Sequence, residues 1–196
     1  MADYTAFVEA SNALVELLRD HLTPEPLSDR ETISLCSPHE NENNQLTIFL
    51  YEVEEEGAQN SVGYYQADRD TQRIRPARFV LRYLVTAHSK APAQLKEADK
   101  HRIMGAVVQV LRDNPVIPAK YLSGSTLAER ATLHVSVERT QLEQLLKIWN
   151  NTTKEYKLSM VVSVTGVTIS SGVTRRIPRV TDVEIETAQM EQGGAL

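Results

Sequence analysis

The chain has 196 residues, of which 41% are apolar and 24% charged, with a net charge of −5 and one cysteine, Cys36. The single cysteine excludes an internal disulfide and a cysteine-based zinc cluster, and no run of about 18 apolar residues predicts a membrane-spanning helix. The N-terminus lacks the basic flank and apolar stretch of a secretion signal, so the residues predict one globular domain made in the cytoplasm.

Charge is divided unevenly along the chain. Residues 1–70 hold 15 acids and 3 bases, whereas residues 71–196 hold 11 acids and 18 bases. This division favours contact between complementary surfaces, including head-to-tail contact between copies, over general nucleic-acid binding. Two solvated faces of a monomer are the alternative interpretation, and from charge alone the commoner one.

The first ninety residues predict one helix and two strands. The helix spans residues 4–22, with Asp3 as its cap, Pro24 as its stop and apolar residues at helical spacing. Leu46–Val53 predicts an inner strand, and Phe79–His88 a second strand. Between them, Glu54–Ala77 has almost no apolar periodicity, which predicts a long exposed loop that acts as a contact arm.

The second half predicts two further helices and two further strands. Residues 93–111 form a helix that Pro115 ends, and Leu133–Val137 alternates as a short strand. A capping box, Thr140–Glu143, starts a helix that is predicted to turn Leu142, Leu145, Leu146 and Trp149 inward. Residues 156–164 alternate as a strand that continues towards Ile169.

These elements predict an α+β fold, a largely antiparallel mixed sheet packed with about three helices on one face. The packed domain is expected to span residues 1–171. Gly172 marks its end, and residues 172–196 are expected to form a flexible C-terminal arm in which Val180–Ile185 can pair as an added strand.

No catalytic, cofactor-binding or metal-ligating residues are predicted. Cys36, His39 and Glu40 lie close in sequence, and a small cysteine hydrolase that uses Cys36 and His39 is the alternative of a different class. A buried residue before a proline turn explains the same segment better. The histidines have no ligand spacing, and Ser123–Thr126 lacks the pattern of a phosphate loop.

Arginines in the predicted loop and arm are the candidate interface residues, since their planar groups suit carboxylates. Solvated loop charge is the common alternative. No aromatic residues interleave with these arginines to stack bases, so protein is preferred to nucleic acid as the partner. The candidates are Arg69, Arg73, Arg75, Arg78, Arg175, Arg176 and Arg179, together with Val180, Val183 and Ile185 of the tail.

Five segments in order resemble a known family. They are Leu46–Val53 (LTIFLYEV), residues 81–89 (LRYLVTAHS), residues 101–116 (HRIMGAVVQVLRDNPV), residues 137–150 (VERTQLEQLLKIWN) and residues 156–164 (YKLSMVVSV). The segments resemble the N-terminal domain of the cap, or tail-terminator, proteins of extracellular contractile injection systems. The resemblance covers about residues 4–171.

The resemblance implies a tail-terminator-like fold and a structural role without catalysis or cofactor. It implies a hexameric ring that binds sheath protein and inner tube protein at the distal end of a released, extracellular particle, ends polymerisation and stabilises the extended sheath. No nucleic acid or membrane is implied. A terminator or connector of a contractile phage tail shares this role and is the nearest alternative.

Overall fold

The computed structural model describes residues 4–39, 43–57, 63–68, 70–150 and 156–176. Its helices are α1 (Ala6–Leu22), α2 (Lys96–Asp113), α3 (Gly124–Ala128) and α4 (Leu142–Asn150), with 3-10 turns η1 (Arg30–Thr32) and η2 (Ala119–Tyr121). Its strands are β1 (Ile33–Leu35), β2 (Leu46–Glu55), β3 (Tyr64–Asp68), β4 (Thr71–Ile74), β5 (Ala77–Ala87), β6 (His134–Glu138), β7 (Ser159–Ile169) and β8 (Thr174–Arg176).

A five-stranded sheet forms the centre of the molecule, in the order β1-β2-β5-β7-β6. β1 and β2 run parallel, and the other neighbours run antiparallel. The sheet is therefore mixed and largely antiparallel, and β2 is an inner strand, as the sequence predicted. The α+β fold class is confirmed.

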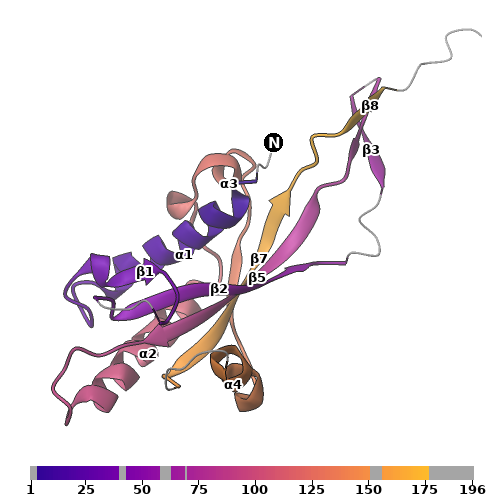
Figure 1. Ribbon diagram of the computed structural model, residues 1–196. Helices are drawn as coiled ribbons and strands as arrows, with labels where there is room; N and C mark the ends of the chain where they lie inside the picture. Colours follow the sequence, from indigo (N-terminus) through magenta and orange to yellow (C-terminus); the bar gives the residue numbers. More distant parts are fainter. Residues whose placement is uncertain (1–3, 40–42, 58–62, 69, 151–155, 177–196) are drawn as a thin grey trace, which may run out of the picture.

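Helices cover both faces of this sheet rather than the one face predicted, and β5 supplies side chains to each face in turn. Tyr83 and Val85 join the main core with α1 and α2. Leu84 points to the other face and packs in a second cluster with Leu145 and Trp149 of α4. Figure 1 shows α1 and α4 on opposite sides of the sheet. The alternation of a strand thus supports two separate apolar cores.

Helix α1 lies across the main face with the predicted apolar stripe inward. Leu14, Leu17 and Leu18 are fully buried. The helix begins at Ala6 with Thr5 as its N-cap residue. The predicted cap, Asp3, lies outside the described residues. The Ser11 hydroxyl and the Tyr83 phenol share a buried hydrogen bond of 2.8 Å, which fixes the helix against β5.

The prediction of a long structureless loop over Glu54–Ala77 is wrong. β3 and β4 pair as an antiparallel hairpin, and β8 pairs with the other side of β4. This three-stranded sheet projects from the body as an arm (Figure 1). Both faces of the arm keep exposed or half-buried residues, so no apolar alternation marks its strands in the sequence. Backbone pairing alone reveals them.

Residues just past the predicted domain boundary belong to this arm. β8 follows Gly172 and pairs in register with β4, Arg175 opposite Gln72. The first part of the predicted C-terminal arm is thus a strand of the three-stranded sheet. The rest of that segment lies outside the described residues, and the boundary after residue 171 stays a prediction.

Two helices differ from the predictions. α2 starts at Lys96 rather than at residue 93. α4 buries Leu145 and Trp149, but Leu142 in its first turn is 60% exposed. An amphipathic pattern identifies a helix reliably. The residues of its first turn can still be exposed, because the helix begins beyond the edge of the sheet surface that it covers.

Candidate assembly surfaces

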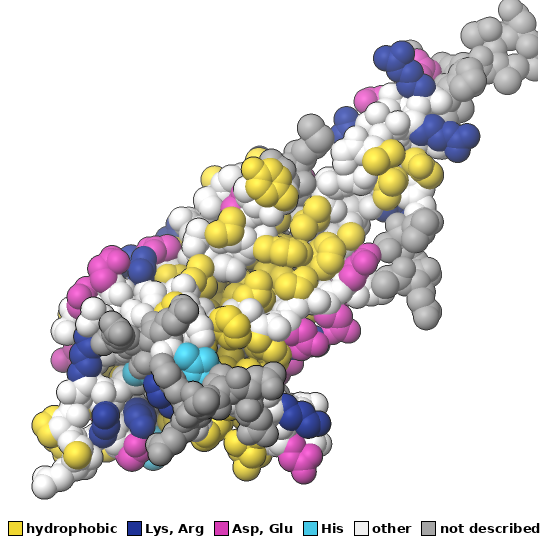
Figure 2. All heavy atoms as spheres, viewed as in Figure 1, with side chains coloured by type: hydrophobic (Ala, Val, Ile, Leu, Met, Phe, Trp, Pro, Cys, Tyr) yellow, Lys and Arg dark blue, Asp and Glu magenta, His cyan; other side chains and the backbone are white. Residues whose placement is uncertain are grey.

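The arm brings together four of the predicted arginines. Arg73 lies in β4 opposite Thr174 of β8, and Arg175 and Arg176 follow in β8. Arg75 directly follows β4 and is exposed, as are both arginines of β8. Arg73 is half-buried. In Figure 2 the Lys and Arg side chains are prominent at the outer end of the arm.

Two tyrosines that no sequence pattern marks accompany these arginines. Tyr65 of β3 lies directly opposite Arg73, and Tyr64 lies opposite Ile74. The tyrosines are 46% (Tyr64) and 38% (Tyr65) exposed. The pairing of β3 with β4 brings Tyr65 beside Arg73. The sequence does not show this proximity, because the two residues are eight positions apart. Tyrosine beside arginine is the composition that protein interfaces favour.

An acidic surface lies on the α4 face of the sheet. Arg82 of β5 donates to Glu54 at 2.6 Å and to Glu138 of β6 at 3.1 Å, and it lies 3.5 Å from Glu52. The hydrogen bond to Glu54, with the neighbouring carboxylates, raises the pKa of Arg82. Three carboxylates thus surround one guanidinium, and the surplus negative charge faces solvent at Glu52 and Glu54.

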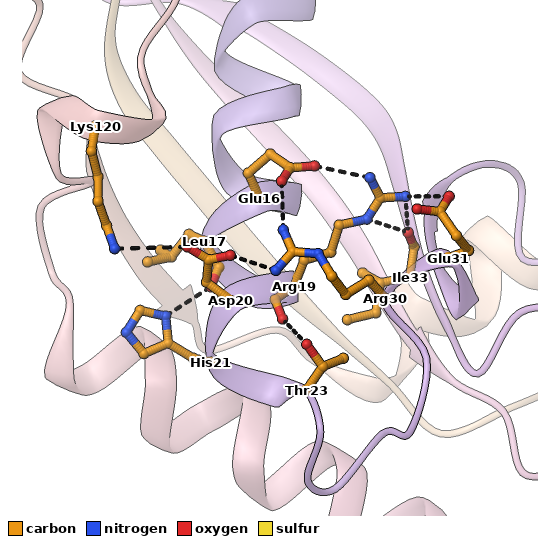
Figure 3. A network of polar contacts seen from close by, with 10 residues as sticks. All are labelled: Glu16, Leu17, Arg19, Asp20, His21, Thr23, Arg30, Glu31, Ile33 and Lys120. Atoms are coloured by element: carbon orange, nitrogen blue, oxygen red, sulfur yellow. Dashed lines mark hydrogen bonds and ion pairs between the residues drawn. The ribbon is translucent and has the colours of Figure 1, made fainter.

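Most acids around the C-terminal end of α1 are neutralised within the fold. Arg30 contacts Asp20 at 2.6 Å and Glu16 at 2.9 Å, and Lys120 lies 3.7 Å from Asp20 (Figure 3). Arg19 contacts Glu16 and also donates to the Ile33 carbonyl, which ties α1 to β1. The acidic first part of the sequence is therefore not uniformly acidic at the surface, and the β2 face is the stronger candidate.

The segment around Cys36 has structural partners. The Cys36 sulfur lies 3.3 Å from both the Ser34 hydroxyl and the Asn44 amide nitrogen. The His39 ring packs edge-on against Trp149, with 4.9 Å between the ring centroids. Glu40 lies outside the described residues. His39 thus contributes to the second apolar core, in keeping with the interpretation of this segment as packing.

The described residues include no group of three or more His, Cys, Asp or Glu side chains able to hold a metal ion. Within the same residues, no helix is both long and apolar enough to cross a membrane.

The structure describes only part of the predicted interface set. Arg78 is exposed near the start of β5, beside the arm. Arg69, Arg179, Val180, Val183 and Ile185 lie outside the described residues. The set remains a prediction, and the arm brings four of its arginines together.

A two-sided α+β sheet with a projecting β arm defines a fold of the tail-terminator type. The chain belongs to the family of the Pvc16 N-terminal domain, whose model matches residues 9–182. A direct comparison with curated proteins finds no significant match.

Solved structures share this fold. The chain is similar to the PVC sheath/tube terminator of an extracellular contractile injection system in its extended state, with a TM-score of 0.59 and 19% identity over 96% of this chain and 64% of that one. It is also similar to the tube-terminating cap of the anti-feeding prophage, with a TM-score of 0.56 and 19% identity over 92% of this chain and 61% of that one. The chain thus spans slightly less than two thirds of each of these proteins.

Proposed function

We propose that this protein is a structural cap that ends the inner tube and sheath of a contractile injection particle and stabilises the extended sheath. The observation that carries the proposal is the terminator fold, which extends over 96% of the chain. Family membership over residues 9–182 supports the same role. The protein is made in the cytoplasm and joins a particle that is later released.

The cap acts as a hexameric ring that contacts sheath and tube protein, and the surfaces described above support its closure. The basic arm of one copy, with Arg75 and Arg176, meets the acidic β2 face of the next, with Glu52 and Glu54. Because these two surfaces differ, the contact is head-to-tail and repeats until a ring closes. Exposed charges of this kind set orientation and association rate more than affinity.

The protein acts without catalysis. Cys36 and His39 each have packing partners, which supports a structural role for their segment. The variant Cys36→Ser is expected to cap particles as the unmodified protein does. Loss of capping in a folded Cys36→Ser protein would revive the hydrolase alternative.

Electron microscopy of particles assembled without this gene tests the cap role directly. Overlong, ragged or unstable particles are expected, and a plasmid copy of the gene should restore normal ends. Normal, closed particles in the deletion strain would refute the proposal. Particles with a terminated sheath but an unterminated tube would show a narrower role than the one proposed.

Charge reversal tests the ring contact. Arg73 is half-buried, so the exposed pair Arg75→Glu and Arg176→Glu is the better choice. We expect this double variant to stay folded and to assemble at least tenfold more weakly at low salt, because like charges then face each other. The exposed pair Lys90→Glu and Lys96→Glu changes net charge equally and is the control. Equal assembly of both double variants would contradict charge closure.

A further inference from the structure

A pocket lies beside the acidic β2 face, between β2, β6 and α4. It has a volume of about 500 Å³. Glu52 and Glu54 line it from β2, and Lys147 and Ile148 line it from α4. Tyr51 also lines the pocket and is half-buried, as is Ile148. The pocket therefore combines an acidic side on β2, a lysine on α4 and two partly buried hydrophobic side chains.

The acidic side of the pocket keeps surplus negative charge. The side chains of Glu52 and Glu54 are 48% and 57% exposed. Arg82 is the cation that these two share with Glu138, so one positive charge serves three negative ones. Burial, together with the charges of Glu52 and Glu138, raises the pKa of Tyr51. The β2 side of the pocket therefore suits a guanidinium group from a partner.

The pairing of the arm strands places complementary side chains on one face of the arm. Tyr65 of β3 and Arg73 of β4 lie opposite each other and share this face. Thr71, two positions before Arg73, lies on the same face, and its partners are Asp68 of β3 and Arg176 of β8. This Tyr65 face thus carries a tyrosine and an aspartate on the β3 side and arginines on the β4 and β8 side.

We propose that the Tyr65 side chain of a neighbouring copy of this chain enters the pocket and anchors the contact between copies. Its ring then packs against Tyr51 and Ile148. A tyrosine that fills a pocket at the centre of an interface commonly supplies a large part of the binding energy. The inference rests on the head-to-tail contact of the proposed function, and it adds the residue and the pocket that give this contact its affinity.

The charges around the anchor match when the arm lies in one orientation. With the β3 side of the Tyr65 face towards α4, Asp68 faces Lys147. The β8 side then turns Arg176 towards Glu54. All the arm residues involved share one face of the arm, and Glu52 and Glu54 share one face of β2 because they are two positions apart. A single approach therefore satisfies the aromatic and the charged contacts together.

The tyrosine comes from a neighbour because the arm is held away from its own pocket. Only Arg75 and Pro76 join β4 to β5, and two residues span at most about 7 Å. Figure 1 shows the arm projecting away from α4. The Tyr65 face and the pocket are different surfaces, so each copy gives one tyrosine and receives one. This is the head-to-tail arrangement that closes rings.

Substitution of the anchor tests the contact by sedimentation of the isolated full-length protein. We expect Tyr65→Ala to weaken self-association at least about tenfold, and Tyr65→Phe, which keeps the ring, to do so by less than about threefold. The matched control is Tyr64→Ala. Tyr64 is 46% exposed against 38% for Tyr65, but it lies opposite Ile74 on the other face of the arm. Equal losses for Tyr64→Ala and Tyr65→Ala would overturn the proposal.

A charge swap tests the orientation of the arm. Asp68→Lys and Lys147→Asp each place like charges together, so each should weaken self-association. The double variant restores the opposite charges in reversed order and should associate within about twofold of the unmodified chain. Losses that simply add in the double variant would refute the proposed orientation.

Cross-linking tests whether the two surfaces meet between copies. In a Cys36→Ser background, one preparation carries Tyr65→Cys and another carries Gln144→Cys, an exposed residue that lines the pocket. A short bis-maleimide should give a cross-linked dimer in the mixture and in neither preparation alone. A chain with both substitutions should give a ladder of oligomers. A double-substituted chain that links only to itself, or no link at all, would overturn the proposal.

The pocket contact and the cap role can fail separately, because one is measured on isolated protein and the other on particles. A Tyr65→Ala protein that self-associates normally would refute the pocket contact and leave the cap role standing. Normal, closed particles in the deletion strain would refute the cap role and leave the contact standing.

Discussion

The Glu9 carboxylate of α1 accepts a hydrogen bond of 2.9 Å from the backbone N–H of Thr126, which is 117 residues away in the chain. The hydroxyls of Ser125 and Thr5 donate to the same carboxylate at 2.9 Å and 2.7 Å. Glu9 is 8% exposed. A single charged group thus fastens the first helix to the segment that leads into β6.

Replacing Glu9 by Gln should destabilise the protein in a pH-dependent way. Burial raises the pKa of this carboxyl, but the hydrogen bonds from Thr5, Thr126 and Ser125 outweigh it and hold the pKa at about 2, below the ordinary 4.5. Stability from this group is therefore complete above pH 4.5 and is lost as the pH falls towards 2. We expect the free energy of unfolding to fall by about 1–2 kcal/mol at pH 7, measured by urea unfolding.

The exposed Glu143→Gln is the matched control for this experiment, since it removes one carboxylate in the first turn of α4. It should change the free energy of unfolding by less than about 0.5 kcal/mol. Equal effects of the two substitutions would show that the Glu9 contacts do not stabilise the fold.

Gly124→Ala should destabilise the protein through the same contact. Gly124 has a φ of +51°, and an added Cβ would lie 2.3 Å from the Glu9 Oε1 atom. The substitution combines left-handed strain with a clash, and we expect a loss of about 2–3 kcal/mol in the free energy of unfolding. A loss below about 0.5 kcal/mol would contradict the close approach.

Gly105→Ala is the opposite case and serves as the control. Gly105 lies inside α2, and nothing lies within 4 Å of an added Cβ. Alanine has a higher helix propensity, so this substitution should stabilise the protein by about 0.5–1 kcal/mol. Thermal melts of both glycine variants, compared in one buffer, distinguish local space from a general effect of added methyl groups.

His88 should make stability depend on pH in the weakly acidic range. Its ring bonds the Thr47 hydroxyl at 3.0 Å, and burial, with the nearby charges of Lys157 and Lys100, lowers its pKa from 6.5 to about 4. The unfolded chain therefore binds the proton more readily, so stability is complete above pH 6.5 and falls between pH 6.5 and 4. We expect a loss of about 1–3 kcal/mol across this window.

Denaturant unfolding at several pH values measures this slope for His88→Gln and for the exposed His101→Gln. Only His88→Gln should flatten the decline between pH 6.5 and 4, even if the buried substitution lowers stability at every pH. An unchanged slope would mean that another group causes the acid sensitivity.

Arg82→Gln should weaken the protein and change its response to salt. The substitution leaves Glu52, Glu54 and Glu138 without their shared cation. We expect a loss of about 1–2 kcal/mol at low salt that becomes smaller in 1 M NaCl, because salt screens the repulsion. The exposed Arg78→Gln should show neither effect. A loss independent of salt would indicate lost packing of the Arg82 stem instead.

The sequence predicts the elements that bury a face and misses those that do not. Tyr83 and Val85 alternate with residues of the second core, and Leu14 and Leu18 recur at helical spacing, so β5 and α1 carry strong patterns. β4 is half-buried throughout, and β8 is exposed throughout. Their strands exist because backbone groups pair, which leaves no mark on side-chain polarity.

The candidate interface was predictable as a set of arginines but not as a surface. Arg73 and Arg175 are about a hundred positions apart, and only the β4–β8 pairing brings them together. Tyr65 was not predicted as an interface residue, because only the β3–β4 pairing places it opposite Arg73. The carboxylates around Arg82 come from β2 and β6, which are likewise distant in the sequence.

Short connections tie the arm to the body. β4 reaches β5 through Arg75 and Pro76 alone, and residues 170–173 join β7 to β8. Two residues span at most about 7 Å, so the arm can tilt but cannot travel. A pull on β4 or β8 passes along covalent chain into β5 and β7, which are hydrogen-bonded to each other in the middle of the sheet. A load applied from outside would thus be carried by the central strands, while the helices that cover them bear little of it.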